Sequence, residues 1–61
     1  MKLTINIEMD NDAFQISPPS EVITLLNKFI HAVKDAGLPD EMMLMDSNGN
    51  TAFKATLQRD D

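Results

Sequence analysis

The chain has 61 residues, of which 43% are hydrophobic, with no cysteine, one histidine and a net charge of −5. A chain of about 60 residues forms one domain with a thin core, since it buries only about 60% of the surface that it exposes when unfolded. The missing cysteines exclude disulfides and thiolate metal sites, and the acidic balance argues against a nucleic-acid binder, which needs clustered Lys and Arg. We expect no metal, no cofactor and no direct contact with nucleic acid.

The chain contains no apolar run near the roughly 20 residues of a membrane span. Its N-terminus alternates polar and apolar residues, whereas a signal peptide has a continuous apolar stretch there. We therefore expect a cytoplasmic protein without a membrane contact, in the host cytoplasm if a phage encodes it. The lack of cysteine fits such a reducing compartment.

Residues 2–9 alternate with a period of two, which predicts a half-buried strand. The apolar face carries Leu3, Ile5, Ile7 and Met9, and the polar face carries Lys2, Thr4, Asn6 and Glu8. The next three residues, 10–12, are typical of a turn. The segment 13–16 fits either a short return strand or a loop anchored by Phe14 and Ile16.

Residues 18–36 predict a helix. Ser17 or Ser20 can cap it, and Pro18 suits the first helical position because its missing N–H is not needed there. The helix should end at Gly37, since glycine tolerates the left-handed conformation and Pro39 prevents continuation. At 100° per residue the apolar arc consists of Val22, Leu25, Leu26, Phe29, Ile30, Val33 and Ala36.

Residues 41–58 predict a β-hairpin, because Asn48-Gly49 between two strand-like runs favours a two-residue type I′ turn. That turn would place Leu44 opposite Phe53 and Met42 opposite Ala55. These four residues and Leu57 then share the core face. Met43, Met45 and Lys54 lie on the other face with Thr56 and Gln58.

Together these elements predict an α+β domain of β-α-β-β order, with one helix packed on one face of a three-stranded, mainly antiparallel sheet. The simplest strand order places the third strand in the middle. Direct parallel pairing of the first and second strands is the alternative that the linker length permits.

Three segments occur in an order that resembles a group of short acidic proteins of phages and prophages, many of them uncharacterised. They are Asp10–Phe14, with the pattern Asp-Asn-x-Ala-Phe, Glu21–Leu26, and Leu44–Thr51, which contains the pattern Asp-x-Asn-Gly-Asn. The group often has glycine where this chain has Phe53, and a shorter segment before the helix. The resemblance implies an accessory phage product, a class that often binds host or defence proteins; it carries over no functional residue.

Other motifs have simpler explanations. The segment Asp46–Asn50 hints at a calcium loop, but an EF-hand counted from Asp46 would need glycine two positions later than Gly49 and a glutamate where Leu57 stands. His31 lies on the polar arc of the helix, without a nucleophile and an orienting group near it in the helical pattern. The eight carboxylates in strand ends and loops favour solubility over imitation of nucleic acid. We therefore expect no enzyme.

The methionines of the hairpin that the alternation places on the outer face are the feature that points to a function. The alternative is that the loop of residues 10–17 partly covers them or that the strand is locally irregular. One helix leaves one face of the sheet bare, and methionines on a bare sheet suit an adaptable contact surface. The candidate contact residues are Met43, Met45, Lys54, Glu8 and Asp46. We predict a non-enzymatic protein-binding module, a homodimer, that inhibits a host or anti-phage defence protein, for example of the CRISPR type. A small regulator, an antitoxin-like protein or a structural accessory phage protein is the alternative.

Overall fold

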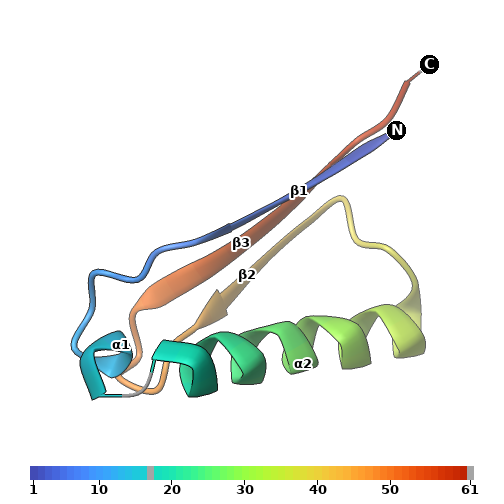
Figure 1. Cartoon of the computed structure of the whole chain (residues 1–61). Helices are drawn as coiled ribbons and strands as arrows, with labels where there is room; N and C mark the ends of the chain where they lie inside the picture. The colour runs from blue at the N-terminus through green and yellow to red at the C-terminus, as the bar shows by residue number, and fades with distance from the viewer. Residues whose placement is uncertain (17, 61) are drawn as a thin grey trace.

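The computed structural model describes residues 1–16 and 18–60 (Figure 1). Its elements follow the order β1 (Lys2–Ile7), α1 (Ala13–Ile16), α2 (Pro18–Ala36), β2 (Glu41–Met45) and β3 (Thr51–Gln58). The α+β class is thus confirmed, and α2 has the predicted limits. Ser17, one of the two predicted caps, lies outside the described residues. The helix ends as expected: Gly37 has φ of +83° and its amide donates to the Val33 carbonyl at 2.8 Å.

The sheet has the order β1-β3-β2, with β3 antiparallel to both neighbours. The third strand is therefore central, and the alternative with parallel pairing of β1 and β2 is wrong. Met42 lies opposite Ala55 and Leu44 opposite Phe53, as the hairpin pattern predicted. A register shift follows between Leu44 and Met45. An irregularity of this kind increases the local twist of the strand pair.

The core lies between α2 and one face of the sheet. Its buried members are Phe14, Leu25, Phe29, Ala52, Phe53 and Ala55. Phe53 is completely buried in the central strand, and its ring lies 5.5 Å from that of Phe29, centroid to centroid, at an angle of 41°. Tilted aromatic pairs at this separation add to the free energy gained from burying apolar area alone. The contact attaches the helix to the middle of the sheet.

The segment between β1 and α2 differs from both predicted conformations. β1 ends at Ile7 rather than at residue 9, although the Glu8 amide still donates to the Ala52 carbonyl at 2.7 Å. Residues 13–16 form the short helix α1, neither a return strand nor a loop. Phe14 in this helix is buried against the core, as expected of an anchor, whereas the side chain of Ile16, the other predicted anchor, lies outside what the structure describes. A single helical turn carries little propensity signal, and packing decides its conformation.

The turn of the hairpin is longer than predicted. Gly49 has φ of +84°, but Asn48 does not have the positive φ that a type I′ turn requires. The Gly49 amide donates to the Asp46 carbonyl at 3.1 Å, and the Asp46 amide donates to the Asn50 carbonyl at 2.8 Å. These bonds are those of a three-residue loop, Ser47–Gly49, in which glycine follows a type I turn in the left-handed conformation.

One part of the predicted core face remains open. Figure 1 shows that the end of the sheet that carries both termini rises away from α2. Leu3 and Ile5, at this end of β1, are 40% and 38% exposed, and Ile30 of the predicted apolar arc is 47% exposed. Apolar side chains thus line an uncovered area beside the helix.

We expect Phe53→Ala to lower the free energy of unfolding by about 3–5 kcal/mol, since it deletes a fully buried ring. Such a loss approaches the total stability of a small domain. Phe53→Leu should cost about 1.5 kcal/mol or less. Urea denaturation followed by circular dichroism measures both, with the exposed Met43→Ala as a control that should stay within about 0.5 kcal/mol of the parent. Equal stability of all three variants would contradict the central role of Phe53.

Candidate functional site

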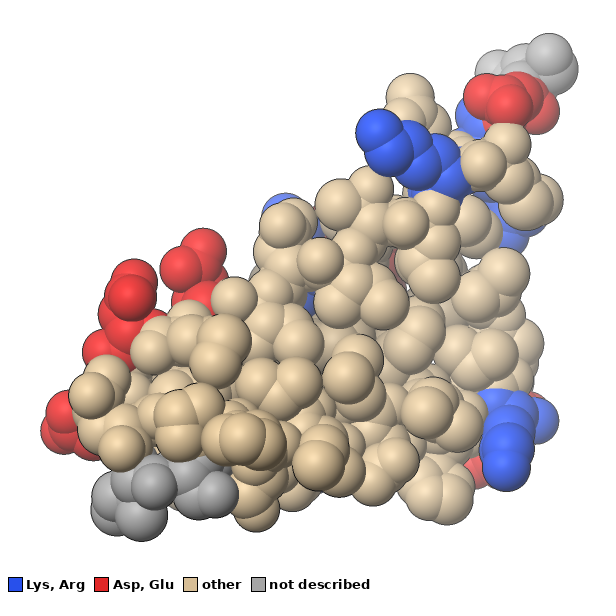
Figure 2. All heavy atoms as spheres, in the orientation of Figure 1, with Lys and Arg blue, Asp and Glu red and all other residues tan. Residues whose placement is uncertain are grey.

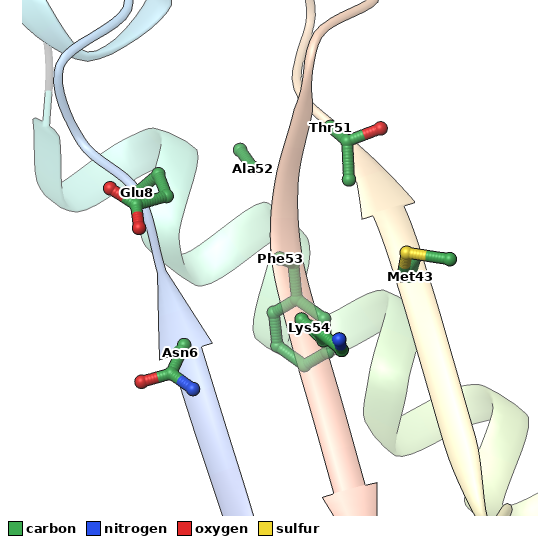
Figure 3. Close-up of a pocket in the computed structure, with 7 residues that line it drawn as sticks. All are labelled: Asn6, Glu8, Met43, Thr51, Ala52, Phe53 and Lys54. Carbon is green, nitrogen blue, oxygen red and sulfur yellow. The ribbon is translucent and has the colours of Figure 1, made fainter.

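The face of the sheet away from α2 carries the predicted contact residues. Met43 and Met45 are each 58% exposed, and Met43 lies opposite Lys54 in the register of β2 and β3. Asn6 lies opposite Lys54 on the other side, in β1. The alternation of β3 places Phe53 in the core and Lys54 on this outer face, as Figure 3 shows for both side chains. The methionines therefore do not share the interior with Phe29.

A shallow depression of about 280 Å³ lies on this outer face at the end of the sheet near the hairpin turn. Its lining consists of Asn6, Glu8, Met43, Thr51, Ala52, Phe53 and Lys54 (Figure 3). The structure thus brings together three predicted contact residues, namely Glu8, Met43 and Lys54, from all three strands. Sequence reasoning did not identify Asn6 and Thr51 as neighbours of these residues. The register of the two strand pairs was the only signal that could have done so.

The outer face presents charges of both signs around an apolar side chain. Lys54 Nζ lies 3.7 Å from a carboxylate oxygen of Glu41, and both side chains are about half exposed. An exposed pair of this kind contributes little to stability and rearranges easily. Glu8 lies on the β1 side of the depression and Met43 on the β2 side (Figure 3). The depression beside Met43 can receive an apolar side chain of a partner, while Glu8 and Lys54 can bond to polar groups of the partner next to that side chain.

Asp46 has a structural role that the sequence did not reveal. Its side chain is 6% exposed. One carboxylate oxygen accepts hydrogen bonds from the amides of Asn48 and Asn50, at 2.9 and 3.0 Å, and the other accepts one from the side-chain amide of Asn11 at 2.7 Å. The carboxylate therefore shapes the hairpin loop and ties it to the segment after β1. Because its acceptor oxygens are used inside the protein, we leave Asp46 out of the contact surface.

The three segments of the phage-like pattern meet at this end of the fold. Asn11 bonds to Asp46, as described, and Glu21 at the start of α2 accepts a hydrogen bond from the Ser47 amide at 2.7 Å. The first and last of these segments are 35 positions apart in sequence. Periodicity and local spacing carry no signal for such a pairing, so sequence reasoning missed it. The residues of the pattern thus form a junction of hydrogen bonds that connects the hairpin loop to the segment after β1 and to the start of α2.

Other reactive groups remain dispersed. His31 is exposed on α2. Over the described ranges 1–16 and 18–60, no three His, Asp or Glu side chains gather where they could hold a metal ion. No helix within these same ranges has the length and apolarity to cross a bilayer.

Comparisons with models of protein families, with curated proteins and with solved structures returned no match. The similarity to phage proteins stays a prediction that depends on the order of the three segments.

We expect Asp46→Ala to lower the free energy of unfolding by about 2 kcal/mol, because it leaves the Asn48 and Asn50 amides and Asn11 without their acceptor. Asp46→Asn keeps one acceptor oxygen for the two amides and should cost about half as much. A double-mutant cycle with Asn11→Ala, measured by urea denaturation, should give a coupling of about 1 kcal/mol. Additive losses would mean that the bond between the two side chains contributes nothing.

Proposed function

We propose that this chain is a non-enzymatic protein-binding module that contacts its partner through the outer face of the sheet. The observation that carries the proposal is the pair of half-exposed methionines, Met43 and Met45, on a sheet face that the helix leaves uncovered. Methionine is flexible and polarisable, and it adapts to varied partner surfaces. The depression beside Met43 supplies a place for an anchoring side chain.

The chemistry of this face favours a protein partner over other ligands. The depression is about half open to solvent, whereas sites for small molecules are usually enclosed and bury most of their ligand. The polar groups around it include both Glu8 and Lys54, which suits the mixed charge of a protein surface. The net charge of −5 disfavours a polyphosphate backbone.

The identity of the partner class rests on the resemblance to phage proteins. On that basis the partner is a host or anti-phage defence protein, such as a CRISPR-type effector, and binding inhibits it. The acidic end formed by Glu8, Asp10 and Asp12 lies next to the depression and would steer the chain to a basic groove. Such steering acts on the rate of association and weakens with added salt.

The double substitution Met43→Lys with Met45→Lys tests the outer face. We expect a folded chain, since both positions are exposed, and a loss of partner binding of about 2 kcal/mol or more, roughly 30-fold in affinity. Quantitative mass spectrometry compares what the tagged parent and the variant retain from host lysate. A host or defence protein identified this way is then titrated in purified form by calorimetry.

Lys28→Glu provides the control, because it also changes the net charge by two units, the double variant adding two positive charges, but lies on the exposed side of α2 away from the outer face. It should retain the same partner with unchanged affinity. A partner that binds the double variant as tightly as the parent would exclude the outer face. A purified chain that leaves every tested defence system active would exclude the inhibitory role.

A further inference from the structure

The outer edge of β1 offers backbone groups for another strand. β1 lies at the edge of the sheet with β3 as its neighbour, and the Glu8 amide bonds towards β3. Along an antiparallel pair of strands, hydrogen-bonded residues alternate with residues that are not hydrogen-bonded to the neighbouring strand. Because Glu8 is bonded to β3, the other even-numbered residues of β1 are bonded to β3 as well. Leu3, Ile5 and Ile7 then direct their amides and carbonyls to the open edge. The strand contains no proline, one of the devices that protect edges from pairing.

Exposed apolar side chains lie on both layers beside this edge. On the sheet they are Leu3 and Ile5, which face the helix side but are only partly covered. On α2 they are Ile23 and Ile30, which are 57% and 47% exposed. Residues seven apart occupy the same flank of a helix. An apolar area of this kind on a small monomer indicates a contact surface.

The flank of Ile23 and Ile30 faces the β1 side. Glu21 bonds to the Ser47 amide in the loop after β2, so the flank of Glu21 faces β2. Ile23 follows two residues later, about 200° around the helix, and therefore lies on the opposite flank. Figure 3 shows that α2 begins on the β1 side of the sheet, near Glu8, and crosses behind it towards β2, so the first turns of the helix are those nearest to β1.

The two ends of β1 carry side chains of opposite charge. Glu8 lies at the end of β1 that leads to α1, and Lys2 lies at the end that carries the termini. Figure 2 shows acidic side chains at the first end and both basic and acidic side chains at the second. At the second end Asp60 pairs with the N-terminus and Arg59 with Asp40. A twofold axis through the middle of β1 brings Glu8 of each copy towards Lys2 of the other, so these two charges are complementary.

We propose that β1 pairs with β1 of a second copy, antiparallel about a twofold axis at Ile5, so that two three-stranded sheets become one. In this register Ile5 lies opposite the partner's Ile5, and Leu3 lies opposite the partner's Ile7. The edge groups of all three residues are bonded. On the outer face Lys2 lies opposite the partner's Glu8, and the pair occurs twice by symmetry. Opposite charges in directly facing positions stabilise strand pairing.

Neighbouring registers lack this match. A slip that pairs Thr4 with the partner's Thr4 places Lys2 opposite the partner's Asn6 and leaves Glu8 beyond the end of the pairing. A slip of one residue would turn the apolar face of one copy to the polar face of the other. The opposite slip, which pairs Asn6 with the partner's Asn6, would set Lys2 opposite the partner's Asp10, but Asp10 lies beyond the end of β1. The register centred on Ile5 is the one that pairs Lys2 with Glu8.

The helices complete the contact. The twofold axis places the start of the partner's α2 beneath the terminal end of β1, where Leu3 and Ile5 are exposed. Ile23 of each copy, near the start of α2, then faces the other copy. The edge of β2 offers no such match, since a twofold axis at Met43 would set Glu41 opposite the partner's Met45, and Glu41 already lies beside Lys54.

Charge reversal tests the proposal. Sedimentation equilibrium from low micromolar to submillimolar concentration should show a monomer–dimer equilibrium for the parent chain. Lys2→Glu and Glu8→Lys should each raise the dissociation constant about tenfold, since each sets like charges opposite one another twice. The double variant exchanges the two charges and should restore the parent constant within about threefold. Lys28→Glu, which makes the same charge change on the exposed side of α2, is the control and should have no effect.

Cysteine cross-linking tests the register, because the chain has no native cysteine. In the proposed pairing Thr4 lies opposite the partner's Asn6 in a non-bonded pair, where side chains are closest. An oxidised mixture of the Thr4→Cys and Asn6→Cys chains should therefore form mixed disulfide dimers. Each variant oxidised alone should form far fewer.

A single chain mass at every concentration would overturn the proposal. Rapid self-cross-linking of Thr4→Cys alone would overturn the register, and a dimer that the Met43→Lys, Met45→Lys variant abolishes would overturn the choice of edge. The proposal does not depend on the proposed function. A dimer that passes these tests stands even if no host partner binds, and a partner lost from the methionine variant leaves the dimer untouched.

Discussion

The packing of Phe29 in α2 against Phe53 in β3 determines which side of the sheet is covered. Phe53 occupies the central strand, with Ile7 and Leu44 opposite it on its two sides. The single long helix attaches at this point, 5.5 Å between ring centres. Because side chains alternate along a strand, burying Phe53 turns Lys54 and its neighbour Met43 outward. The bare outer face is a consequence of this one aromatic contact.

The three segments that resemble phage proteins hold the fold together and do not form the proposed contact with a partner. Asp46 organises the hairpin loop, Asn11 connects that loop to the start of α1, and Glu21 fastens the start of α2 to it. A chain that shares these segments would share this junction and hence the packing of its elements. It need not share a binding surface, since Met43 lies outside the three segments and Met45 is not part of the Asp-x-Asn-Gly-Asn pattern. The resemblance therefore supports a fold more strongly than it supports a function.

The parts of the fold that the sequence predicts correctly are those with local signals. Proline and glycine mark the limits of α2, and the alternation of residues 42–45 and 53–57 sets the hairpin register. Asp46 shapes the hairpin loop through local bonds to the amides of Asn48 and Asn50. The bond from Asn11 that ties this loop to the segment after β1 spans 35 positions, and no local pattern encodes it. The exposure of Leu3 and Ile5 depends on the direction in which α2 crosses the sheet. A burial pattern indicates the inner face of a strand but not how far a helix extends over it.

The size of the outer face links the two proposed surfaces. Three strands about 4.8 Å apart and about 20 Å long present roughly 300 Å² in projection, whereas a standard interface buries about 800 Å² on each partner. One copy is therefore small for a stable protein contact through this face alone. Joining two sheets at β1 doubles the face and repeats the depression beside Met43 on the same side of the joined sheet. A partner that engages both copies gains from the effective concentration of the second site. The proposed edge pairing at Ile5 would raise the face to roughly 600 Å² in projection, which approaches the area that a standard interface buries on one partner.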